Sequence, residues 1–338
     1  MEGKVGKAKM AKSKSYNWGI IATGAIARQF SIGLNFAPGA VKYAVASREL
    51  QKAESFADEY GFRKAYGSYE ELLADPKVDI VYIATPHQFH TENTIAALKA
   101  KKAVLCEKPF AVNAAAAKEM VKTARENNCL LMEAMWTRFI PAVQKAKEMV
   151  EQGEIGDIRM ITGDFGYRTE VGVPDRIYDP AACGGGLMDV GIYPVSLASM
   201  FFKEQPEEIQ ALAEIGSTSV DEQSAYLFRY KGGEMAVLYS AIRTETPVEA
   251  VIMGTRGRIK LHAPFYKADK ISVVKENEER IISIPYEGNG YEFEAIEMMR
   301  CMSEGLLESP VMPLDESVAV METMDRIRSC INLCFPYD

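Results

Sequence analysis

The feature that most limits the fold of this chain is an alternation of short apolar runs with amphipathic stretches across residues 18–135. The apolar runs cover residues 18–23, 41–47, 79–85, 103–107 and 129–134. Helical patterns, such as residues 49–60 and 113–127, lie between these runs. Strands that are apolar along their whole length are buried on both faces, and helices between them indicate a parallel sheet covered on each side. We therefore predict an N-terminal α/β domain built on a doubly wound parallel sheet.

The pattern changes after about residue 155. Strand patterns follow one another at residues 159–167, 208–215, 224–230, 234–242, 248–253 and 258–261, with a hairpin turn at 231–233. Helical patterns cover residues 187–202, 291–304 and 315–330. This order predicts a second α/β domain with a mostly antiparallel sheet. At about 150 residues per domain, the length fits two domains. We divide the chain into a basic, flexible arm (1–17), a first domain (18–138) and a second domain (139–338).

Charge and cysteine usage exclude several classes of protein. The net charge is −8, and the arm at 1–17 holds five Lys and one Glu, so the rest of the chain is more acidic still. An acidic body disfavours binding to nucleic acid or to an anionic membrane. Six scattered Cys and three His show no zinc spacing, so we expect no metal site. The arm lacks the apolar segment of a secretory signal, and we expect a cytoplasmic protein.

The first apolar run leads into Ala22-Thr23-Gly24-Ala25-Ile26-Ala27, which a helical pattern follows. This is the G-x-G-x-x-G/A fingerprint of dinucleotide-binding (Rossmann) domains with its first glycine replaced by alanine. Gly24 would let a pyrophosphate approach the backbone, and the helix N-terminus would supply amide donors. When the motif is considered without its context, a plain tight turn with no bound dinucleotide would also explain it. The strand before it and the helix after it favour a dinucleotide contacted by Thr23, Gly24, Ala25 and Ile26.

The second run ends at Ser47-Arg48, where NAD-binding domains carry an acidic residue. A hydroxyl and a guanidinium suit the 2′-phosphate of NADP, because arginine forms bidentate, charge-assisted bonds to phosphate. We therefore predict NADP, with NAD as the less favoured cofactor. The alternative is a solvated arginine at the start of the next helix, beside Glu49.

Polar side chains follow two further runs, at Thr85-Pro86 with His90 after them, and at Glu107-Lys108. Ligands of parallel sheets bind at the C-terminal ends of the strands, so we place these residues beside the cofactor. Lys108 is a candidate cation between cofactor and substrate. The alternatives are a surface-loop histidine and an exposed lysine at a strand end.

A glycine-rich segment, Gly184-Gly-Gly-Leu-Met-Asp189-Val-Gly-Ile-Tyr193-Pro194, precedes the helix expected at 187–202. Asp189 and Tyr193 are four residues apart and share one helix face. Together with a nearby lysine they would form a proton-transfer group, because a cation favours the phenolate and lowers the tyrosine pKa. The alternative is an aspartate that faces the helix dipole and a tyrosine in the core.

Taken together, these motifs resemble the glucose–fructose oxidoreductase / inositol dehydrogenase / MocA-like family. The resemblance covers the chain after residue 17 and is carried by residues 19–27, 84–86, 107–109, 184–194, 254–259 and 312–317. It implies a dinucleotide-binding domain followed by an α/β domain with a large, open, mostly antiparallel sheet. One face of that sheet would form a homo-oligomer, a dimer or tetramer. It also implies that Lys108 contacts both nicotinamide and substrate.

One residue departs from the pattern of the family and narrows the resemblance to one of its branches. Many members of the family carry a histidine four residues after the aspartate, where this sequence has Tyr193. The sequence is similar to the branch that contains dimeric dihydrodiol dehydrogenase and NADP-dependent D-xylose dehydrogenase, and the Ser47-Arg48 pair is similar to its NADP-binding members. In that branch the residues that match Trp136, Arg138 and Arg168 line the substrate pocket.

The resemblance implies an NADP(H)-dependent oxidoreductase that transfers a hydride between nicotinamide and a sugar or related vicinal diol. Tyr193 would exchange the hydroxyl proton, Lys108 would lower the tyrosine pKa, and Asp189 would orient Lys108 or a second substrate hydroxyl. One alternative is an oxidoreductase that recycles a tightly held cofactor between two sugars. A second is a dinucleotide-binding regulator without turnover. A third is glycoside cleavage that uses the same cofactor.

Overall fold

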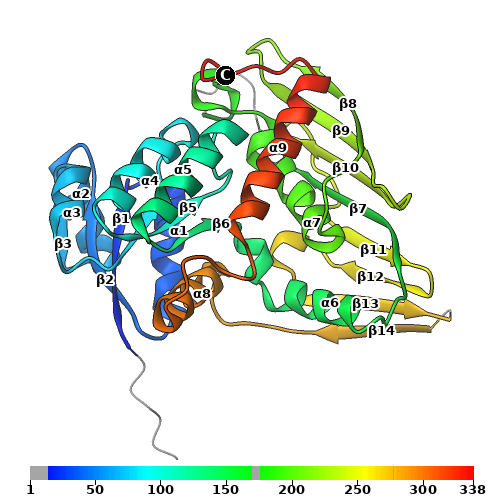
Figure 1. Cartoon of the computed structure of the whole chain (residues 1–338), viewed down its shortest axis with the longest axis horizontal. Coiled ribbons are helices and arrows are strands. Elements are labelled where there is room, and N and C mark those ends of the chain that lie inside the picture. Colours follow the sequence, from blue (N-terminus) through cyan, green and yellow to red (C-terminus); the bar gives the residue numbers. More distant parts are fainter. Residues whose placement is uncertain (1–13, 170–175, 277) are drawn as a thin grey trace, which may run out of the picture.

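The computed structural model describes residues 14–169, 176–276 and 278–338, and its first layer is a six-stranded parallel sheet (Figure 1). The strand order is β3-β2-β1-β4-β5-β6, and each neighbouring pair is parallel. The strands are β1 (Tyr16–Ile21), β2 (Ala40–Ala46), β3 (Lys64–Tyr66), β4 (Ile80–Ile83), β5 (Ala103–Glu107) and β6 (Leu131–Ala134). The predicted parallel sheet is confirmed. The expected arm lies mostly in residues 1–13, outside the described residues.

Helices cover the faces of this sheet, and several begin at the caps that their sequences favour. These helices are α1 (Ala25–Gly33), α2 (Leu50–Tyr60), α3 (Tyr69–Ala74), α4 (His90–Lys99) and α5 (Ala114–Asn127). Asn113 caps α5 through its side-chain oxygen, which accepts a hydrogen bond from the Ala116 amide at 2.9 Å. The strand order reverses between β1 and β4, so the crevice at their C-terminal ends is where a ligand of such a sheet binds.

The second layer is an eight-stranded sheet in the order β14-β13-β12-β11-β7-β10-β9-β8. Its pairs are antiparallel except β7 with β10, which confirms a mostly antiparallel sheet. The strands are β7 (Ile158–Gly166), β8 (Glu208–Ile215), β9 (Asp221–Arg229), β10 (Met235–Ala241), β11 (Ala250–Gly254), β12 (Gly257–Leu261), β13 (Lys270–Lys275) and β14 (Glu278–Ser283). The sequence analysis missed β13 and β14. The edge strand β14 is exposed and charged along most of its length, so it lacks the alternation of a half-buried strand.

Three longer helices pack on the second sheet: α6 (Pro141–Glu151), α7 (Ile192–Phe202) and α9 (Leu314–Cys330). A fourth, α8 (Tyr291–Glu304), packs on α1 and β2 of the first layer. The helix expected at 187–202 is not uniform, because Leu187–Gly191 forms a π-helical turn before α7. Such turns occur often at functional sites. Short 3₁₀ helices lie at η1 (Leu34–Phe36), η2 (His87–Phe89), η3 (Trp136–Phe139), η4 (Arg176–Tyr178), η5 (Pro180–Ala182) and η7 (Phe265–Lys267). The stretch Pro180–Phe202 is long and apolar enough to span a membrane, but 89% of its apolar window is buried, as in a core helix.

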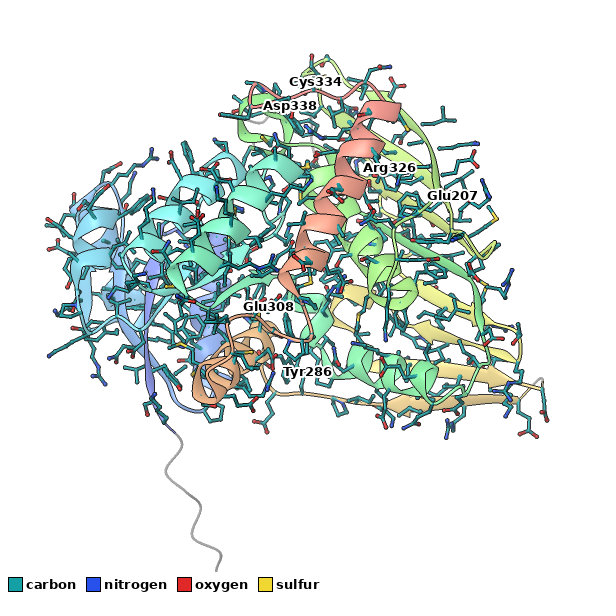
Figure 2. The ribbon with its side chains drawn as sticks, viewed as in Figure 1. Glu207, Tyr286, Glu308, Arg326, Cys334 and Asp338 are labelled. Carbon is teal, nitrogen blue, oxygen red and sulfur yellow. The ribbon has the colours of Figure 1, made fainter. Side chains whose placement is uncertain are left out.

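The C-terminal helices join the two layers. Figure 1 shows α9, in red, between the helices of the first sheet and the strands of the second. On one side the Ala114 amide donates to the Asp325 carboxylate at 2.8 Å. On the other side Arg326 donates to the Glu207 carbonyl just before β8 at 3.1 Å (Figure 2). Helix α8 packs on α1, where Asn289 donates to the Gln29 carbonyl at 2.8 Å. These contacts fix the second sheet over the C-terminal ends of the parallel strands.

Candidate active site

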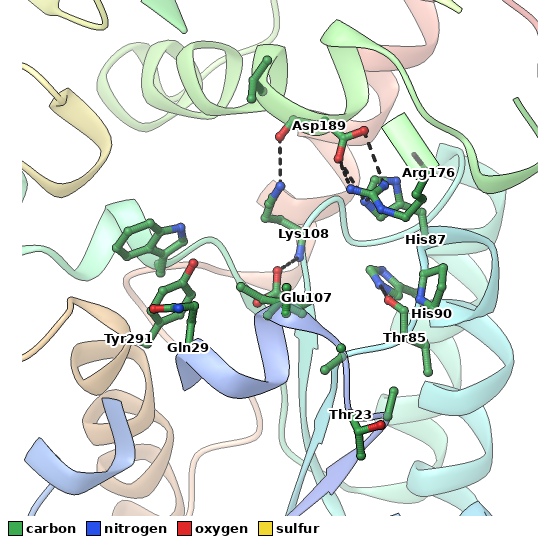
Figure 3. A pocket seen from close by; sticks show the side chains of 18 of the residues that line it. Thr23, Gln29, Thr85, His87, His90, Glu107, Lys108, Arg176, Asp189 and Tyr291 are labelled. Atoms are coloured by element: carbon green, nitrogen blue, oxygen red, sulfur yellow. Dashed lines mark hydrogen bonds and ion pairs between the residues drawn. The ribbon is translucent and has the colours of Figure 1, made fainter. Parts of the chain in front are cut away.

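A cleft of about 680 Å³ lies where the C-terminal ends of the parallel strands face the second layer (Figure 3). It brings together most of the residues that the sequence singled out. Its lining includes Thr23, Gly24, Ala25, Ile26, Ser47, Arg48, Thr85, Pro86, His90, Glu107, Lys108, Trp136, Asp189 and Tyr193. The segments that supply these residues are far apart in sequence, so the tertiary fold assembles the cleft.

The turn after β1 has the backbone that a dinucleotide site requires. Ala22, which stands in place of the first fingerprint glycine, has φ of 81°, in the left-handed region that favours glycine. Gly24 precedes α1, and no other described atom lies within 4 Å of the position that its Cβ would take. The N-terminus of α1 therefore meets open space in the cleft, with amides and the positive end of the helix dipole directed there. This arrangement fits a pyrophosphate.

The end of β2 presents a cation to the same cleft. Arg48 is exposed and makes no ion pair with the residues that the structure describes. The neighbouring Glu49 carboxylate is paired with Lys52 at 2.6 Å, so its charge is partly compensated. The Ser47 hydroxyl lies 3.4 Å from the Glu49 amide, which donates to it. A guanidinium without a carboxylate partner suits a phosphate at this edge.

His90 holds two strand ends together. Its ring nitrogens lie 2.8 Å from the Pro109 carbonyl oxygen and 2.9 Å from the Thr85 carbonyl oxygen. The side chain is fully buried, and burial lowers its pKa to about 4. A neutral imidazole has one N–H, so His90 donates to one of these carbonyls and only contacts the other, and its ring lies between the loops after β4 and β5 at the cleft.

Lys108 reaches from the end of β5 toward the π-helical turn. Its Nζ donates to the Asp189 carbonyl oxygen at 2.9 Å and lies 5.0 Å from the centre of the Tyr193 ring (Figure 3). Burial lowers the pKa of Lys108, whereas the negative charges of Asp189 and Glu107 raise it. The ammonium therefore faces the ring of Tyr193 and donates a hydrogen bond to the backbone of Asp189.

Tyr193 is buried, with 6% of its surface exposed, and its hydroxyl oxygen accepts a hydrogen bond from the Trp136 indole N–H at 2.9 Å. The expected lowering of the Tyr193 pKa by Lys108 is not found. Burial raises this pKa well above its usual value, and the main opposing influence is the Trp136 hydrogen bond. The main physical reason is burial, which disfavours the charged phenolate, and Lys108 lies over the ring at 5.0 Å from its centre without a hydrogen bond to the oxygen in the described part of the chain.

The sequence analysis allowed Asp189 to orient Lys108 or a second substrate hydroxyl. The Asp189 carboxylate is not the group that holds Lys108. It forms an ion pair with Arg176 and lies 3.9 Å from the His87 Nε2. Only the main-chain carbonyl of Asp189 contacts Lys108. Sequence reasoning missed Arg176, because an arginine in a loop carries no motif. The pair places a fixed carboxylate and a guanidinium at one wall of the cleft, where substrate hydroxyls would meet them.

Two expected substrate residues do not line the cleft. Arg138 is 2% exposed and forms an ion pair with Glu316 at 2.7 Å, while its Nε donates to the Ser196 hydroxyl at 2.9 Å. It is a buried link between η3, α7 and α9. Arg168 is exposed and forms an isolated bridge with Arg243 at the end of β7. Neither side chain is part of the cleft lining, and their expected substrate contacts stay a prediction.

An aromatic wall faces Lys108 and was mostly missed. The Trp136 ring stacks on Tyr291 with centroids 4.3 Å apart, and Phe165 stacks on Tyr266 at 4.5 Å. Tyr193 tilts against both Phe165 and Tyr266. These five rings come from five different elements, so no local sequence pattern reveals them. The wall offers a flat, apolar surface opposite the polar Asp189 side.

Buried carboxyls lie behind the cleft. Glu107 is 4% exposed and accepts hydrogen bonds from the Tyr82 hydroxyl and from the Lys108 amide, the latter at 3.1 Å. Burial raises the Glu107 pKa to about 7. Glu294 is fully buried, and neither of its carboxyl oxygens has a hydrogen-bond partner among the residues that the structure describes. Burial and the charge of Glu107 raise the Glu294 pKa well above its usual value, so one of these groups holds a proton at neutral pH.

A fingerprint turn that fits a dinucleotide, together with buried Lys108, Asp189 and Tyr193 beside it, defines a class: an oxidoreductase that uses a nicotinamide cofactor. The chain belongs to the Gfo/Idh/MocA oxidoreductase family. Residues 16–135 match the model "Oxidoreductase family, NAD-binding Rossmann fold", and residues 143–260 match the model "GFO/IDH/MocA C-terminal domain". The resemblance inferred from the sequence is thereby confirmed.

Curated relatives match almost the whole chain. A trans-1,2-dihydrobenzene-1,2-diol dehydrogenase of Mus musculus is 40% identical over 332 residues, covering 95% of this chain and 98% of the relative. The Homo sapiens protein of the same name is 38% identical over 330 residues, with the same coverage. Among solved structures, a levoglucosan dehydrogenase in complex with NADH and levoglucosan has a TM-score of 0.86 at 23% identity, covering 94% of this chain and 98% of the other. A 3-ketoreductase from Actinomadura kijaniata with NADP and TDP-benzene has a TM-score of 0.85 at 24% identity, covering 94% and 98%. These structures share the fold.

Proposed function

We propose that the protein is a cytoplasmic, NADP(H)-dependent dehydrogenase that oxidises a carbinol carbon of a vicinal diol or related sugar, or reduces the matching carbonyl. The observation that carries the proposal is the convergence of Lys108, Asp189 and Tyr193 on the cleft that contains the fingerprint turn. The curated relatives named as dehydrogenases, at 38–40% identity over nearly the full chain, support the same reaction class. All six cysteines are free, which agrees with a reducing compartment.

The bound nicotinamide would supply the hydride chemistry, accepting or donating hydride at its C4 carbon. In the reduction, the neutral Tyr193 hydroxyl, the form that burial favours, would give its proton to the carbonyl oxygen as hydride reaches the carbon. In the oxidation, the Tyr193 phenolate would take the proton of the substrate hydroxyl as hydride leaves the carbon and the carbon–oxygen double bond forms. Lys108, held by the Asp189 carbonyl, would donate to the reacting oxygen of the substrate. The Asp189 carboxylate, fixed by Arg176, would accept from the second hydroxyl of the diol.

NADP is favoured over NAD by the end of β2. Arg48 makes no ion pair within the described part of the chain, and Lys52 compensates the Glu49 charge that would repel a 2′-phosphate. The cleft reaches Ser47, Arg48 and Lys52, so a phosphate there would meet two cations and a hydroxyl.

The two walls of the cleft support a diol on a flat ring as substrate. The stacked pair Trp136 and Tyr291 would hold an apolar ring, while Asp189 and Arg176 would read its hydroxyls. The names of the curated relatives specify such a ring diol. Sugars remain the second candidate class, because Asp189 and Arg176 give the cleft a polar side.

A steady-state assay tests the proposal. We expect NADP reduction with a panel of trans-dihydrodiols, cyclic vicinal diols, aldoses and anhydro-sugars, with the dihydrodiols fastest. Tyr193→Phe should lower turnover by about two to four decades and leave NADP affinity nearly unchanged, since it removes only the proton-exchanging hydroxyl. Measurable NADP binding without turnover of any substrate would refute the proposed dehydrogenase activity and favour a dinucleotide-binding regulator.

We also propose that the outer face of the second sheet joins two or more copies of the chain. Leu212, Ala225 and Tyr239 stand in register across β8, β9 and β10 on that face. Leu212 is 82% exposed and Tyr239 is 38% exposed, and an exposed apolar row of this kind is typical of an interface. Sedimentation of wild type and Leu212→Lys tests this: we expect an oligomer that the lysine weakens, and a monomeric wild type would refute it.

A further inference from the structure

The Tyr193 hydroxyl oxygen is hydrogen-bonded to an indole. The Trp136 Nε1 lies 2.9 Å from the Tyr193 hydroxyl oxygen, and the two side chains are only 4% and 6% exposed. Trp136 follows β6 in η3, whereas Tyr193 lies 57 residues later in α7. The sequence assigned Trp136 to the substrate pocket, and that assignment gives no reason for a hydrogen bond to the proton-exchanging residue.

The chemistry of the two groups fixes the direction of this hydrogen bond. An indole N–H is a donor only, so the Tyr193 oxygen must be the acceptor. The phenolic proton therefore has to point away from Trp136. That proton lies close to the ring plane, whereas Lys108 lies over the Tyr193 ring at 5.0 Å from its centre and Phe165 and Tyr266 tilt against the same ring. Because Tyr193 lines the cleft, we place the proton on the cleft side.

The indole is held in place on several sides. Trp136 stacks on Tyr291 with an interplanar angle of 13°, and its edge meets Tyr266 at 5.6 Å between centroids. Gly290, with φ of 101°, lies so close that a Cβ there would come 2.6 Å from a ring carbon of Trp136. A donor fixed in this way costs little reorganisation when charge develops on its acceptor.

We propose that Trp136 is a positioning residue for the reaction, acting through Tyr193. Its indole N–H holds the Tyr193 hydroxyl with its proton toward the cleft, and it stabilises the phenolate left behind once that proton has passed to the substrate oxygen. This inference rests on the proposed function for its catalytic part, whereas the hydrogen bond itself does not. The charged and titratable groups that face Tyr193 are Lys108, Glu107, Glu294, Tyr266 and Tyr291. Lys108 is the cation among them, and it faces the ring of Tyr193. The hydrogen bond to the Tyr193 oxygen comes from Trp136.

Nuclear magnetic resonance tests the hydrogen bond without any turnover. The chain has two tryptophans, so a ¹H–¹⁵N spectrum should show two indole N–H signals, and Trp136→Phe assigns them by loss of one. In Tyr193→Phe we expect the Trp136 signal to move upfield, because its acceptor is gone. The Trp18 indole is buried and has no hydrogen-bond partner within the described part of the chain, so it serves as the internal reference. An unmoved Trp136 signal would overturn the inference, whatever the enzyme does.

Kinetics test the role of the hydrogen bond. Trp136→Phe keeps an aromatic ring but removes the donor. The rising limb of the kcat–pH profile for diol oxidation, which reports deprotonation of Tyr193 as the general base, should therefore move to higher pH by at least about one unit. The same substitution in a Tyr193→Phe background should cause no further loss of kcat, because the hydroxyl on which it acts is absent. A rise in KM alone, equal in both backgrounds, would instead reduce Trp136 to a wall of the substrate pocket. Absence of wild-type turnover would refute the proposed function, and the indole signal would still decide the contact.

Discussion

Replacing Glu133 with glutamine should make the protein more stable at neutral and alkaline pH. Glu133 lies in β6 with none of its surface exposed, and neither carboxyl oxygen has a hydrogen-bond partner among the described residues. Burial raises its pKa from 4.5 to about 7. Glutamine has nearly the same shape and cannot ionise, so the substitution removes the charge and leaves the packing nearly unchanged.

The sign and size of the effect follow from this pKa. Because the folded-state pKa is raised, the folded protein holds this proton more tightly, and stability falls as the pH rises from about 4.5 to about 7. This rise in the Glu133 pKa contributes about 3 kcal/mol to the free energy of unfolding at low pH. About 2.5 kcal/mol of that contribution is lost between pH 5 and pH 8. The wild type should show this loss at Glu133, whereas Glu133→Gln should not.

Thermal unfolding of both proteins across that pH range measures the difference. The midpoint of Glu133→Gln should rise relative to wild type by about 5 °C between pH 5 and pH 8. Glu119→Gln, an exposed change on α5, is the matched control and should show no pH-dependent gap. A difference between wild type and Glu133→Gln that is the same at both pH values would refute the reasoning, because it would mean that Glu133 is not held protonated by burial.

Three further predictions concern the cleft. Lys108→Met should lower turnover by about a hundredfold or more, while the midpoint of the kcat–pH profile stays in place because Lys108 faces the ring of Tyr193. A shifted midpoint would contradict this prediction. Arg48→Ala should erase most of an NADP over NAD preference of about tenfold, as comparison of kcat/KM for the two cofactors would show. Ala22→Gly should raise the free energy of unfolding by about 1 kcal/mol in denaturant titrations, because φ of 81° is strained for alanine; a loss of stability would contradict it.

Local patterns were enough for the parts of the fold that depend on local physics. The apolar runs predicted the strands of the parallel sheet, because burial on both faces leaves a continuous signature. The helix at 113–127 was bounded nearly as observed, because Asn113 is a good cap and Asn128 adopts the left-handed conformation that ends α5. The positions of Gly24, Lys108 and Tyr193 at one cleft followed from a rule about strand ends and from the family resemblance.

The directions of side chains in the site were decided by the tertiary structure. Arg138 was expected at the substrate, yet it pairs with Glu316, a residue 178 positions away in α9. Arg176 reaches Asp189 although no motif marks it. Lys108 approaches the ring of Tyr193, and Trp136 approaches its oxygen. The sequence determined which chemical groups are available at the strand ends. Only packing between distant segments decided which atoms face one another, because that choice depends on contacts that no local pattern encodes.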